Sequence, residues 1–560
     1  MRRRLWFTVV SLTIGLGMLL AASFASAASS PQGATKKAAT GGTLRIDSRS
    51  DFDYIDPSLA YFSHSWQMLE TVCQNLYRYP DAEGNAGVRP IPGVAQGFPK
   101  FSNGGKLVDI TVRKNYARFQ NGEWVTAKSY ANAMQRNLDP TMQSPAGSNY
   151  MNEIVGAKAV LDGKGKTASG IQVKGNHLIL KFTKPVPDIV NRLTMAFFCP
   201  QPGPSGLPRN KDGISAPFSG AGPYYISAWT PSRSAVLERN PNWKGPIAKT
   251  RLANVDRMEY TFGLSQAATK LRLDKNETDL GAIPTTEVAN VAQQYGINKG
   301  RFFLRKQMTM WYLAMNHEQP LFGPKGSPNG NVPLLKALNT AIDRPALVRQ
   351  FGYLAGARTD QIIPYTMPGF RNWDIYSIRG ANPTKAAALA KGNTRSGHAV
   401  FYTFNSTPGP AVSQVVQQNL KAIGVDVEIK TFDRVVQNQK EATRGEPFDI
   451  TFEGWGADYA DPVSFFNTLL WGGNIQQANN SNVSYFNSPT YNSRILKVAQ
   501  TGGAARFTDY ANLDRDIMKN ASPFAPFINT NARIYVGPDV GCYRFAPAHG
   551  VTNLSAVCKK

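Results

Sequence analysis

Residues 398–453 read HAVFYTFNSTPGPAVSQVVQQNLKAIGVDVEIKTFDRVVQNQKEATRGEPFDITFE. Short apolar and β-branched runs alternate here with segments whose apolar residues recur at helical spacing. The predicted elements are strand 398–403, helix 410–422, strand 425–430, helix 432–443 and strand 448–453. Strands that alternate with ten-residue helices are typical of βαβ units, in which neighbouring strands run parallel. The stretch therefore predicts an α/β fold with a parallel sheet.

Further elements of both kinds lie upstream of this stretch. The predicted ones are strand 42–47, helix 64–77, strand 107–112, helix 126–138, strands 170–173 and 178–182, and helices 333–351 and 383–391. The chain has 560 residues, of which 42% are hydrophobic and 18% charged, as in globular proteins. Because one hydrophobic core stops growing at ~250–300 residues, we expect at least two lobes.

The N-terminus has the pattern of an export signal. Arg2, Arg3 and Arg4 precede an apolar run over 5–20, and Ala25-Ser26-Ala27 follows as a small-residue cleavage site. A signal peptide at 1–27 is the favoured interpretation, and an uncleaved signal anchor is the alternative. No cysteine lies near the cleavage site, so we do not expect a lipid anchor.

The chain contains four cysteines: Cys73, Cys199, Cys542 and Cys558. An even number in an exported protein favours two disulfides, and four cysteines allow three connectivities. The short loop between Cys542 and Cys558 makes that pair the favoured one, which leaves Cys73 with Cys199. A zinc site is the weaker interpretation, because there is no C-x-x-C and no suitably spaced histidine.

The formal net charge is +24. Such a charge could indicate nucleic-acid binding, but the lysines and arginines are scattered and form no basic helix. An exported chain of this kind is better explained by a solvated basic surface close to an anionic envelope. We therefore expect no nucleic-acid partner.

Several short segments follow one another in a recognisable order. They are NGEWVTA (121–127), GAGPYY (220–225), LERNPNW (237–243), WYLAMN (311–316), ALNTAIDR (337–344), LKAIGV (420–425), FDI (448–450) and GWGADYADP (454–462). In this order they resemble the motifs of family 5 of the bacterial extracellular solute-binding proteins, the oligopeptide, dipeptide and nickel-type receptors of ABC importers. The resemblance runs from about residue 42 to 535.

The resemblance implies an α/β periplasmic-binding-protein fold with two lobes, a two-strand hinge between them and an extra inserted subdomain. The implied segments are a signal peptide at 1–27, a flexible tether at 28–42, a discontinuous first lobe at 43–77, 211–303 and 522–560, an inserted subdomain at 78–210, and a second lobe at 304–521. The ligand is expected in the cleft between the lobes.

The resemblance also implies a function. The chain is expected to capture peptides and deliver them to the transmembrane subunits of an ABC permease. It is expected to act as a monomer, in the periplasm or at the outer face of the cytoplasmic membrane. No cofactor, metal or catalytic residue is implied.

The segment 454–462 contains the main candidate residues. In peptide-binding relatives the aspartate of this segment pairs with the α-ammonium of the ligand, and that position is Asp458. An ammonium that leaves water needs a carboxylate partner, since its burial otherwise costs several kcal/mol. The alternative is that Asp458 caps a helix that starts near Pro462.

Other residues are expected to surround the ligand. Trp455 and Tyr459 can offer flat apolar surfaces, and the backbone of Gly454 and Gly456 can pair with a peptide main chain. The alternative for the two aromatic residues is a place in the core between the lobes. Tyr61 and Phe62, after the turn at Asp56-Pro57, correspond to residues that face the cleft in relatives.

One position departs from the pattern of the relatives. Some oligopeptide receptors have an arginine two residues before the Gly-Trp pair, where it can meet the ligand carboxylate. Phe452 stands there in this chain, and the nearest basic residue upstream is Arg444. Recognition of a peptide C-terminus is therefore an open question.

The alternative functions are an enzyme, a receptor for a non-peptide ligand, and a sensor or chaperone. An enzyme is disfavoured, because the five histidines are widely separated and neither G-x-S-x-G nor H-E-x-x-H occurs. The same fold could bind a metal chelate, haem, a sugar or an antibiotic-like molecule, with His317 and His398 as candidate contacts for a chelate. A sensor or chaperone that is not coupled to transport is the third.

Overall fold

The computed structural model describes residues 41–203, 220–243 and 253–560. The predicted signal peptide at 1–27 and all but the last two residues of the predicted tether at 28–42 lie outside the described residues. Within the described ranges, no helix combines the length and the apolar character needed to cross a membrane.

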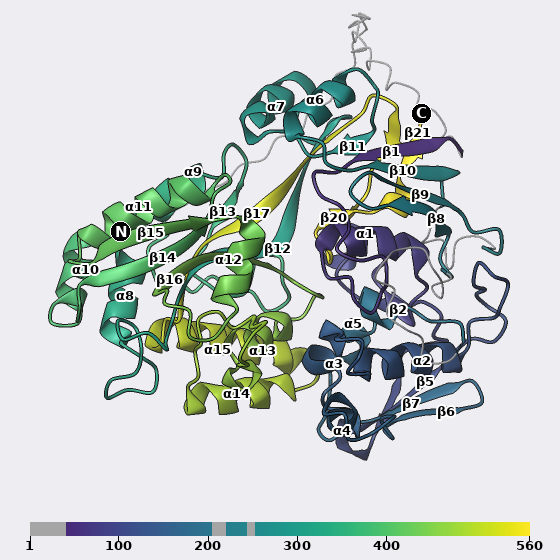
Figure 1. Ribbon diagram of the computed structural model, residues 1–560, viewed down its shortest axis with the longest axis horizontal. Helices are drawn as coiled ribbons and strands as arrows, with labels where there is room; N and C mark the ends of the chain where they lie inside the picture. Colours follow the sequence, from purple (N-terminus) through teal and green to yellow (C-terminus); the bar gives the residue numbers. More distant parts are fainter. Residues whose placement is uncertain (1–40, 204–219, 244–252) are drawn as a thin grey trace, which may run out of the picture. The chain divides into compact units, whose positions relative to one another are not determined.

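A large mixed β-sheet is the main structural element of the fold (Figure 1). Its strands follow the order β15 (Asp426–Phe432), β14 (His398–Phe404), β16 (Ile450–Gly456), β12 (Phe302–Met315), β17 (Phe524–Val536), β11 (Leu280–Gly281), β1 (Thr43–Asp47), β10 (Arg257–Thr261), β9 (Ser234–Arg239) and β8 (Tyr224–Thr230), with β13 (Gly356–Arg358) paired to β17.

The long antiparallel strands β12 and β17 connect the two lobes of the protein. One half of β12 pairs with β16 of the second lobe, and the opposite end of β17 pairs with β11 of the first lobe. The register between β12 and β17 is interrupted between Lys306 and Met310. This interruption lies at the point where the two lobes meet.

The second lobe contains the stretch 398–453. Strand β14 pairs in parallel with both β15 and β16, with His398 opposite Asp426 and Phe401 opposite Ile450, so the parallel pairing predicted here is confirmed. The rest of the sheet is mixed because β12 runs antiparallel to β16 and β17.

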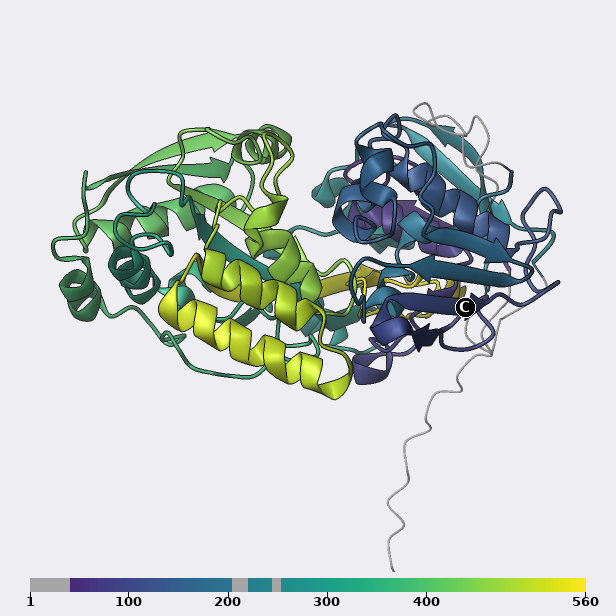
Figure 2. The same ribbon diagram turned by 90° about the horizontal axis from the view of Figure 1, so that it is seen from below.

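Helices cover this lobe, and α14 and α15 pack against each other (Figure 2). The helices are α8 (Val332–Ala341), α9 (Arg344–Arg349), α10 (Pro383–Ala390), α11 (Gly409–Lys421), α12 (Arg434–Glu441), α13 (Val463–Leu470), α14 (Pro489–Ala499) and α15 (Gly503–Asn520).

The single helix predicted over 333–351 is wrong. The structure has two helices, α8 and α9, because Ile342 is extended and Asp343 accepts a hydrogen bond from the Ala346 amide at 3.0 Å. Pro345 fits the first turn of the new helix, where its missing amide hydrogen costs nothing. An N-cap followed by a proline is thus a stronger signal than continuous apolar spacing.

The predicted helix 64–77 ends early. Helix α1 covers Ser63–Val72, and the extended residue Cys73 follows it. Cys73 forms a disulfide with Cys199, and Tyr77–Arg78 belong to strand β2. The apolar residues beyond Val72 are buried because of this cross-link and strand, without helical geometry.

A separate four-stranded sheet lies within the range 78–210. Its order is β4 (Lys100–Ser102), β5 (Leu107–Thr111), β7 (His177–Lys181) and β6 (Ile171–Lys174), and the helices of this region are α2 (Ala127–Leu138), α3 (Pro145–Tyr150), α4 (Ala157–Leu161) and α5 (Ile189–Arg192). Its strands pair with one another and not with the large sheet. The boundaries of the lobes and of the inserted subdomain stay predictions.

Both cysteine pairs lie at disulfide distance. The Cα atoms of Cys73 and Cys199 are 5.3 Å apart, and those of Cys542 and Cys558 are 5.0 Å apart. The second pair joins β18 (Val540–Cys542) to β21 (Cys558–Lys559) and so closes the C-terminal segment into a loop. That loop contributes to the site described next.

Candidate functional site

A cavity of about 390 Å³ lies where the first and second lobes meet. Its volume is in the range of small-molecule sites. The lining residues come from five parts of the chain: Tyr61, Phe62, Ser63 and Trp66; Gln307, Met308 and Thr309; Asn438; Trp455, Gly456, Ala457 and Asp458; and Ala548, His549, Gly550 and Val551.

Asp458 lies in the loop between β16 and α13. Its side chain does not cap α13, because Asp461 Oδ1 accepts the hydrogen bond from the Val463 amide at 3.0 Å. Asp461 itself is held by Arg506, whose two guanidinium nitrogens donate to its carboxylate at 2.8 Å each. The loop is therefore anchored at Asp461, and Asp458 is left to face the cavity.

The Asp458 carboxylate is nearly removed from water, with 7% of the residue exposed. The Tyr61 hydroxyl donates to its Oδ1 at 3.1 Å, and Tyr61 lies 2.9 Å from the Tyr150 hydroxyl. Among the described residues, its buried Oδ2 has no hydrogen-bond partner. Burial raises the pKa of Asp458 to about 7, although bonds from the neighbouring tyrosines oppose the shift. A cation at Oδ2 would stabilise the ionised form.

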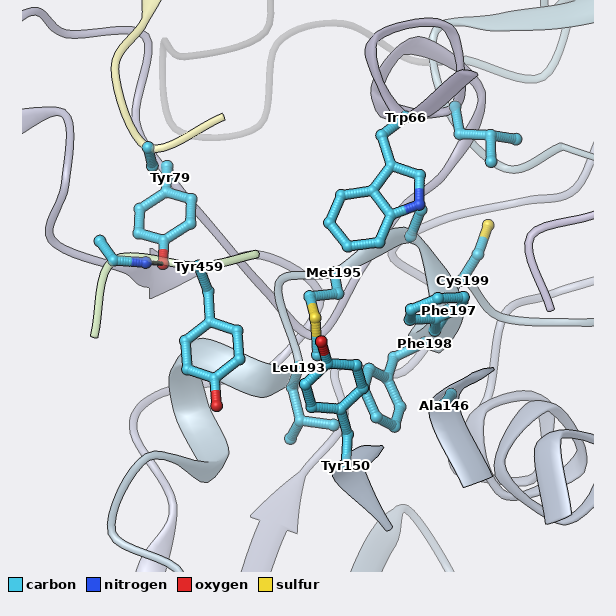
Figure 3. Packing of buried hydrophobic residues seen from close by; sticks show 14 of the residues in the cluster. Trp66, Tyr79, Ala146, Tyr150, Leu193, Met195, Phe197, Phe198, Cys199 and Tyr459 are labelled. Carbon is cyan, nitrogen blue, oxygen red and sulfur yellow. Dashed lines mark hydrogen bonds between the residues drawn. The ribbon is translucent and has the colours of Figure 1, made fainter. Parts of the chain in front are cut away.

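Aromatic side chains form the walls beside this carboxylate. Trp455 donates from its indole nitrogen to the Ser464 carbonyl at 3.1 Å, and Trp66 donates to the Ala60 carbonyl at 2.7 Å, so both rings are fixed. Trp66 and Phe197 pack edge to face at 5.3 Å, with Tyr150 next to Phe197 (Figure 3). These walls are rigid and largely apolar.

Backbone hydrogen bonds position Tyr61 and Phe62. Asp53 Oδ2 accepts from the amides of both residues, at 2.6 and 3.0 Å. Phe62 remains 51% exposed although it lines the cavity. Phe62 is therefore a solvent-accessible part of the cavity wall.

The disulfide-closed C-terminal segment forms a wall that the sequence did not predict. The Gly550 carbonyl accepts from Gln307 Nε2 at 2.9 Å, which fixes this segment to β12. His549 lies with its Nε2 3.3 Å from the Glu70 carboxylate and its ring 5.3 Å from that of Tyr79. The short Cys542–Cys558 loop signalled a compact segment, but no pattern showed where it packs.

Two of the predicted contact residues do not line the cavity. Tyr459 is 1% exposed, and its hydroxyl donates to Asp188 Oδ2 at 2.8 Å. Gly454 faces the Trp311 ring, which would lie 2.6 Å from an added Cβ atom. Tyr459 thus lies in the interface between the lobes, which is the alternative expected for it, and the Cα of Gly454 faces the second lobe; ligand contact by either residue stays a prediction. Figure 3 shows Tyr459 beside Tyr79, whose hydroxyl accepts from the Ala460 amide at 2.9 Å.

The residues around the Tyr459–Asp188 hydrogen bond form an ion pair on each side of the interface. On the first-lobe side, Asp188 pairs with Arg192 at 2.7 Å, and Arg192 also pairs with Glu153 at 3.0 Å. On the second-lobe side, Arg506 pairs with Asp461. Each arginine thus has its carboxylate partner within its own lobe.

The departure at Phe452 has a structural basis. Phe452 is fully buried and packs against Trp311 at 5.2 Å and Phe404 at 5.2 Å. Arg444 is half exposed and pairs with Glu318 at 2.7 Å. Neither residue lines the cavity.

The two histidines considered for a metal chelate lie outside the cavity. His317 is buried and bonds the Met315 carbonyl at 2.8 Å, and burial lowers its pKa to about 4. His398 is exposed beside Asp426 and Glu428. In the ranges that the structure describes, no cluster of three or more His, Cys, Asp or Glu side chains could hold a metal ion.

Comparisons with known proteins agree with this arrangement. A family model described as "Bacterial extracellular solute-binding proteins, family 5 Middle" matches residues 89–477. The dipeptide-binding protein DppE of Bacillus subtilis is 24% identical over 516 residues, which cover 86% of this chain and 87% of that protein.

Solved structures share the fold. The clavulanic acid biosynthesis oligopeptide binding protein 2 superposes with a TM-score of 0.81 at 22% identity, over 93% of this chain and 96% of the other. The periplasmic binding protein DppA from Helicobacter pylori, in complex with the peptide STSA, has a TM-score of 0.73 at 19% identity, over 93% and 98% of the two chains. These neighbours establish a two-lobed α/β binding-protein fold.

Proposed function

The chain belongs to family 5 of the bacterial extracellular solute-binding proteins, and we propose that it is the extracytoplasmic peptide receptor of an ABC importer. It captures peptides in the cavity at Asp458 and delivers them to the transmembrane subunits of a permease. Several relatives are named as peptide-binding proteins, and one neighbour was solved with a peptide, which supports this ligand class.

The observation that carries the proposal is the buried carboxylate of Asp458. One oxygen accepts from Tyr61, and the other has no hydrogen-bond partner in the described part of the chain. A peptide α-ammonium placed at Oδ2 would supply three donors and a positive charge to an acceptor that has lost its water. The low dielectric of the closed cavity would strengthen that pair.

The rest of the cavity suits a peptide of variable sequence. Trp455, Trp66 and Phe62 offer flat surfaces that do not select one side-chain shape. Residues Thr309 and Asn438 offer neutral polar groups to main-chain amides. In this function the protein binds and releases its ligand without converting it, in the periplasm or at the outer face of the cytoplasmic membrane.

Native mass spectrometry of the freshly purified mature protein tests the proposal, followed by denaturation and identification of the bound material. A ladder of short peptides that Asp458→Asn loses is the expected result. Asp426→Asn, at an exposed position outside the cavity, is the matched control and keeps the ladder. A single non-peptide species would overturn the peptide assignment, and peptides retained by Asp458→Asn would overturn the site.

A further inference from the structure

The charges around the cavity are unbalanced. Among its described lining residues, Asp458 is the one carboxylate, and there is no lysine or arginine. The one imidazole among these lining residues is that of His549, and its Nε2 already faces the Glu70 carboxylate at 3.3 Å. The cavity thus offers a charged partner to a ligand ammonium and none to a ligand carboxylate.

Four arginines on the surrounding elements are already engaged by carboxylates. The pairs are Arg192 with Asp188 at 2.7 Å, Arg305 with Glu83 at 3.0 Å, Arg434 with Glu453 at 2.7 Å and Arg506 with Asp461 at 2.8 Å. Redirecting one of these arginines to a ligand would leave a buried or half-buried carboxylate without its counter-ion. That exchange is costly, because breaking such a pair by removing one partner strongly destabilises the remaining charge.

The remaining polar groups of the cavity suit neutral ligands. Gln307 Nε2 donates to the Gly550 carbonyl, and the Ala457 amide donates to the Met308 carbonyl at 2.9 Å, so neither donor is available to an anion. A carboxylate that entered this aromatic cavity would lose its hydration without gaining a charged partner. A carboxamide or a continuing main chain would not incur this cost.

We propose that the cavity recognises a primary ammonium and requires no carboxylate, so that its ligands are peptides held by the N-terminus alone. The cavity then binds peptide amides at least as tightly as short free acids. The same holds for longer peptides whose C-terminus lies outside the cavity. This inference rests on the proposed peptide-binding function and specifies which end of the peptide is recognised.

Matched peptide pools test the inference. Pools of tri- to hexapeptides are prepared as free acids, C-terminal amides and N-acetyl derivatives, and their binding to ligand-free protein is measured by native mass spectrometry. The strongest binder of each pool is then titrated calorimetrically. The variants are Asp458→Asn and, as a control outside the cavity, Arg444→Ala.

We expect free acid and amide to bind within about threefold of each other, and the acetylated peptide to lose at least about thirtyfold in affinity. Asp458→Asn is expected to lose affinity for the free acid and the amide to the same extent, and Arg444→Ala is expected to bind both as the wild type does. The inference would be overturned if peptide amides bound at least tenfold more weakly than the free acids. It would also be overturned if Arg444→Ala lost affinity for the free acids alone. In either case the protein would still be a peptide receptor. Failure of every pool would overturn the peptide function itself, and the inference with it.

Discussion

The Tyr459 hydroxyl donates to Asp188 Oδ2 at 2.8 Å and joins two residues that are 271 positions apart in the sequence. Tyr459 follows the candidate ligand residue Asp458 directly, and Asp188 precedes helix α5 of the other lobe. Two consecutive residues of one loop therefore have different roles: Asp458 lines the cavity, and Tyr459 makes the contact between the lobes.

Tyr459→Phe tests the value of that contact. The change removes a hydrogen bond to a buried carboxylate and should cost roughly 1.5–3 kcal/mol, seen as a lower thermal midpoint. Tyr510→Phe is the matched control, because the buried Tyr510 hydroxyl has no hydrogen-bond partner within the described ranges. Equal midpoints for the two variants would contradict the prediction.

Asp458→Asn is expected to stabilise the ligand-free protein at high pH. Burial raises the pKa of Asp458 to about 7 from an ordinary value near 4, so the folded state holds a proton that the unfolded state releases in that interval. The wild type should therefore lose stability between about pH 4 and 7, whereas the asparagine variant should lose less. Thermal midpoints of both proteins from pH 5 to 8 measure this difference, and a variant less stable than the wild type at pH 8 would refute it.

Asp514 should contribute to the same pH dependence. Burial also raises its pKa to about 7, although the amides of Ile362 and Ile363 each donate to it at 3.1 Å. The Asp458→Asn variant should thus keep a residual loss of stability with rising pH. If the thermal midpoint of Asp458→Asn did not change between pH 5 and 8, the ionisation of Asp514 would cost no folding free energy, and the prediction would be wrong.

The glycines on either side of Trp455 should respond differently to alanine. At Gly454 the new Cβ would lie 2.6 Å from the partly buried Trp311 ring, so overpacking should cost about 1–3 kcal/mol. At Gly456 the nearest atom is Thr309 Oγ1 at 3.6 Å, so this variant should fold normally and carry its methyl group at the cavity. Thermal melts and peptide titrations separate the two effects; similar stability losses would contradict them.

Removal of the Cys542–Cys558 disulfide should loosen the C-terminal wall. A loop of 16 residues predicts a loss of ~3 kcal/mol for the double serine variant. Because Ala548 to Val551 line the cavity, peptide affinity should fall as well. Hydrogen exchange should increase over 543–557 while strands β14 and β15 stay protected. Unchanged exchange in that segment would show that packing alone holds the wall.

The parts of the fold that could be predicted are those with a regular period. The alternation over 398–453 predicts the strands and helices there, and the parallel pairing of β14 with β15 and β16 agrees with it. Helix ends were less predictable. Apolar residues continue at helical spacing past Asp343 and Cys73, but a new helix begins at the Asp343 N-cap and α1 ends before the disulfide-bonded Cys73. Local bonds, not periodicity, decide such positions.

The candidate site was only partly predictable. Asp458 and Tyr61 were identified through the family resemblance, and they meet at 3.1 Å. In an irregular loop neighbouring side chains follow no fixed alternation, so the sequence could not tell that Tyr459 turns away from the cavity. The wall at Ala548 to Val551 depends on where a distant segment packs, which no local pattern records.

Arg192 and Arg506 each keep a carboxylate of their own lobe beside the interface. A hinge movement that separates the lobes would break the Tyr459 contact and leave each of these two arginines with its carboxylate, whereas the Arg305–Glu83 ion pair joins residues of different lobes. The pairs that stay intact limit the electrostatic cost of opening. Moving a two-state equilibrium from 1:99 to 99:1 takes about 5.5 kcal/mol. Ligand contacts in the cavity would have to supply that difference, so that binding shifts the balance between the open and the closed form.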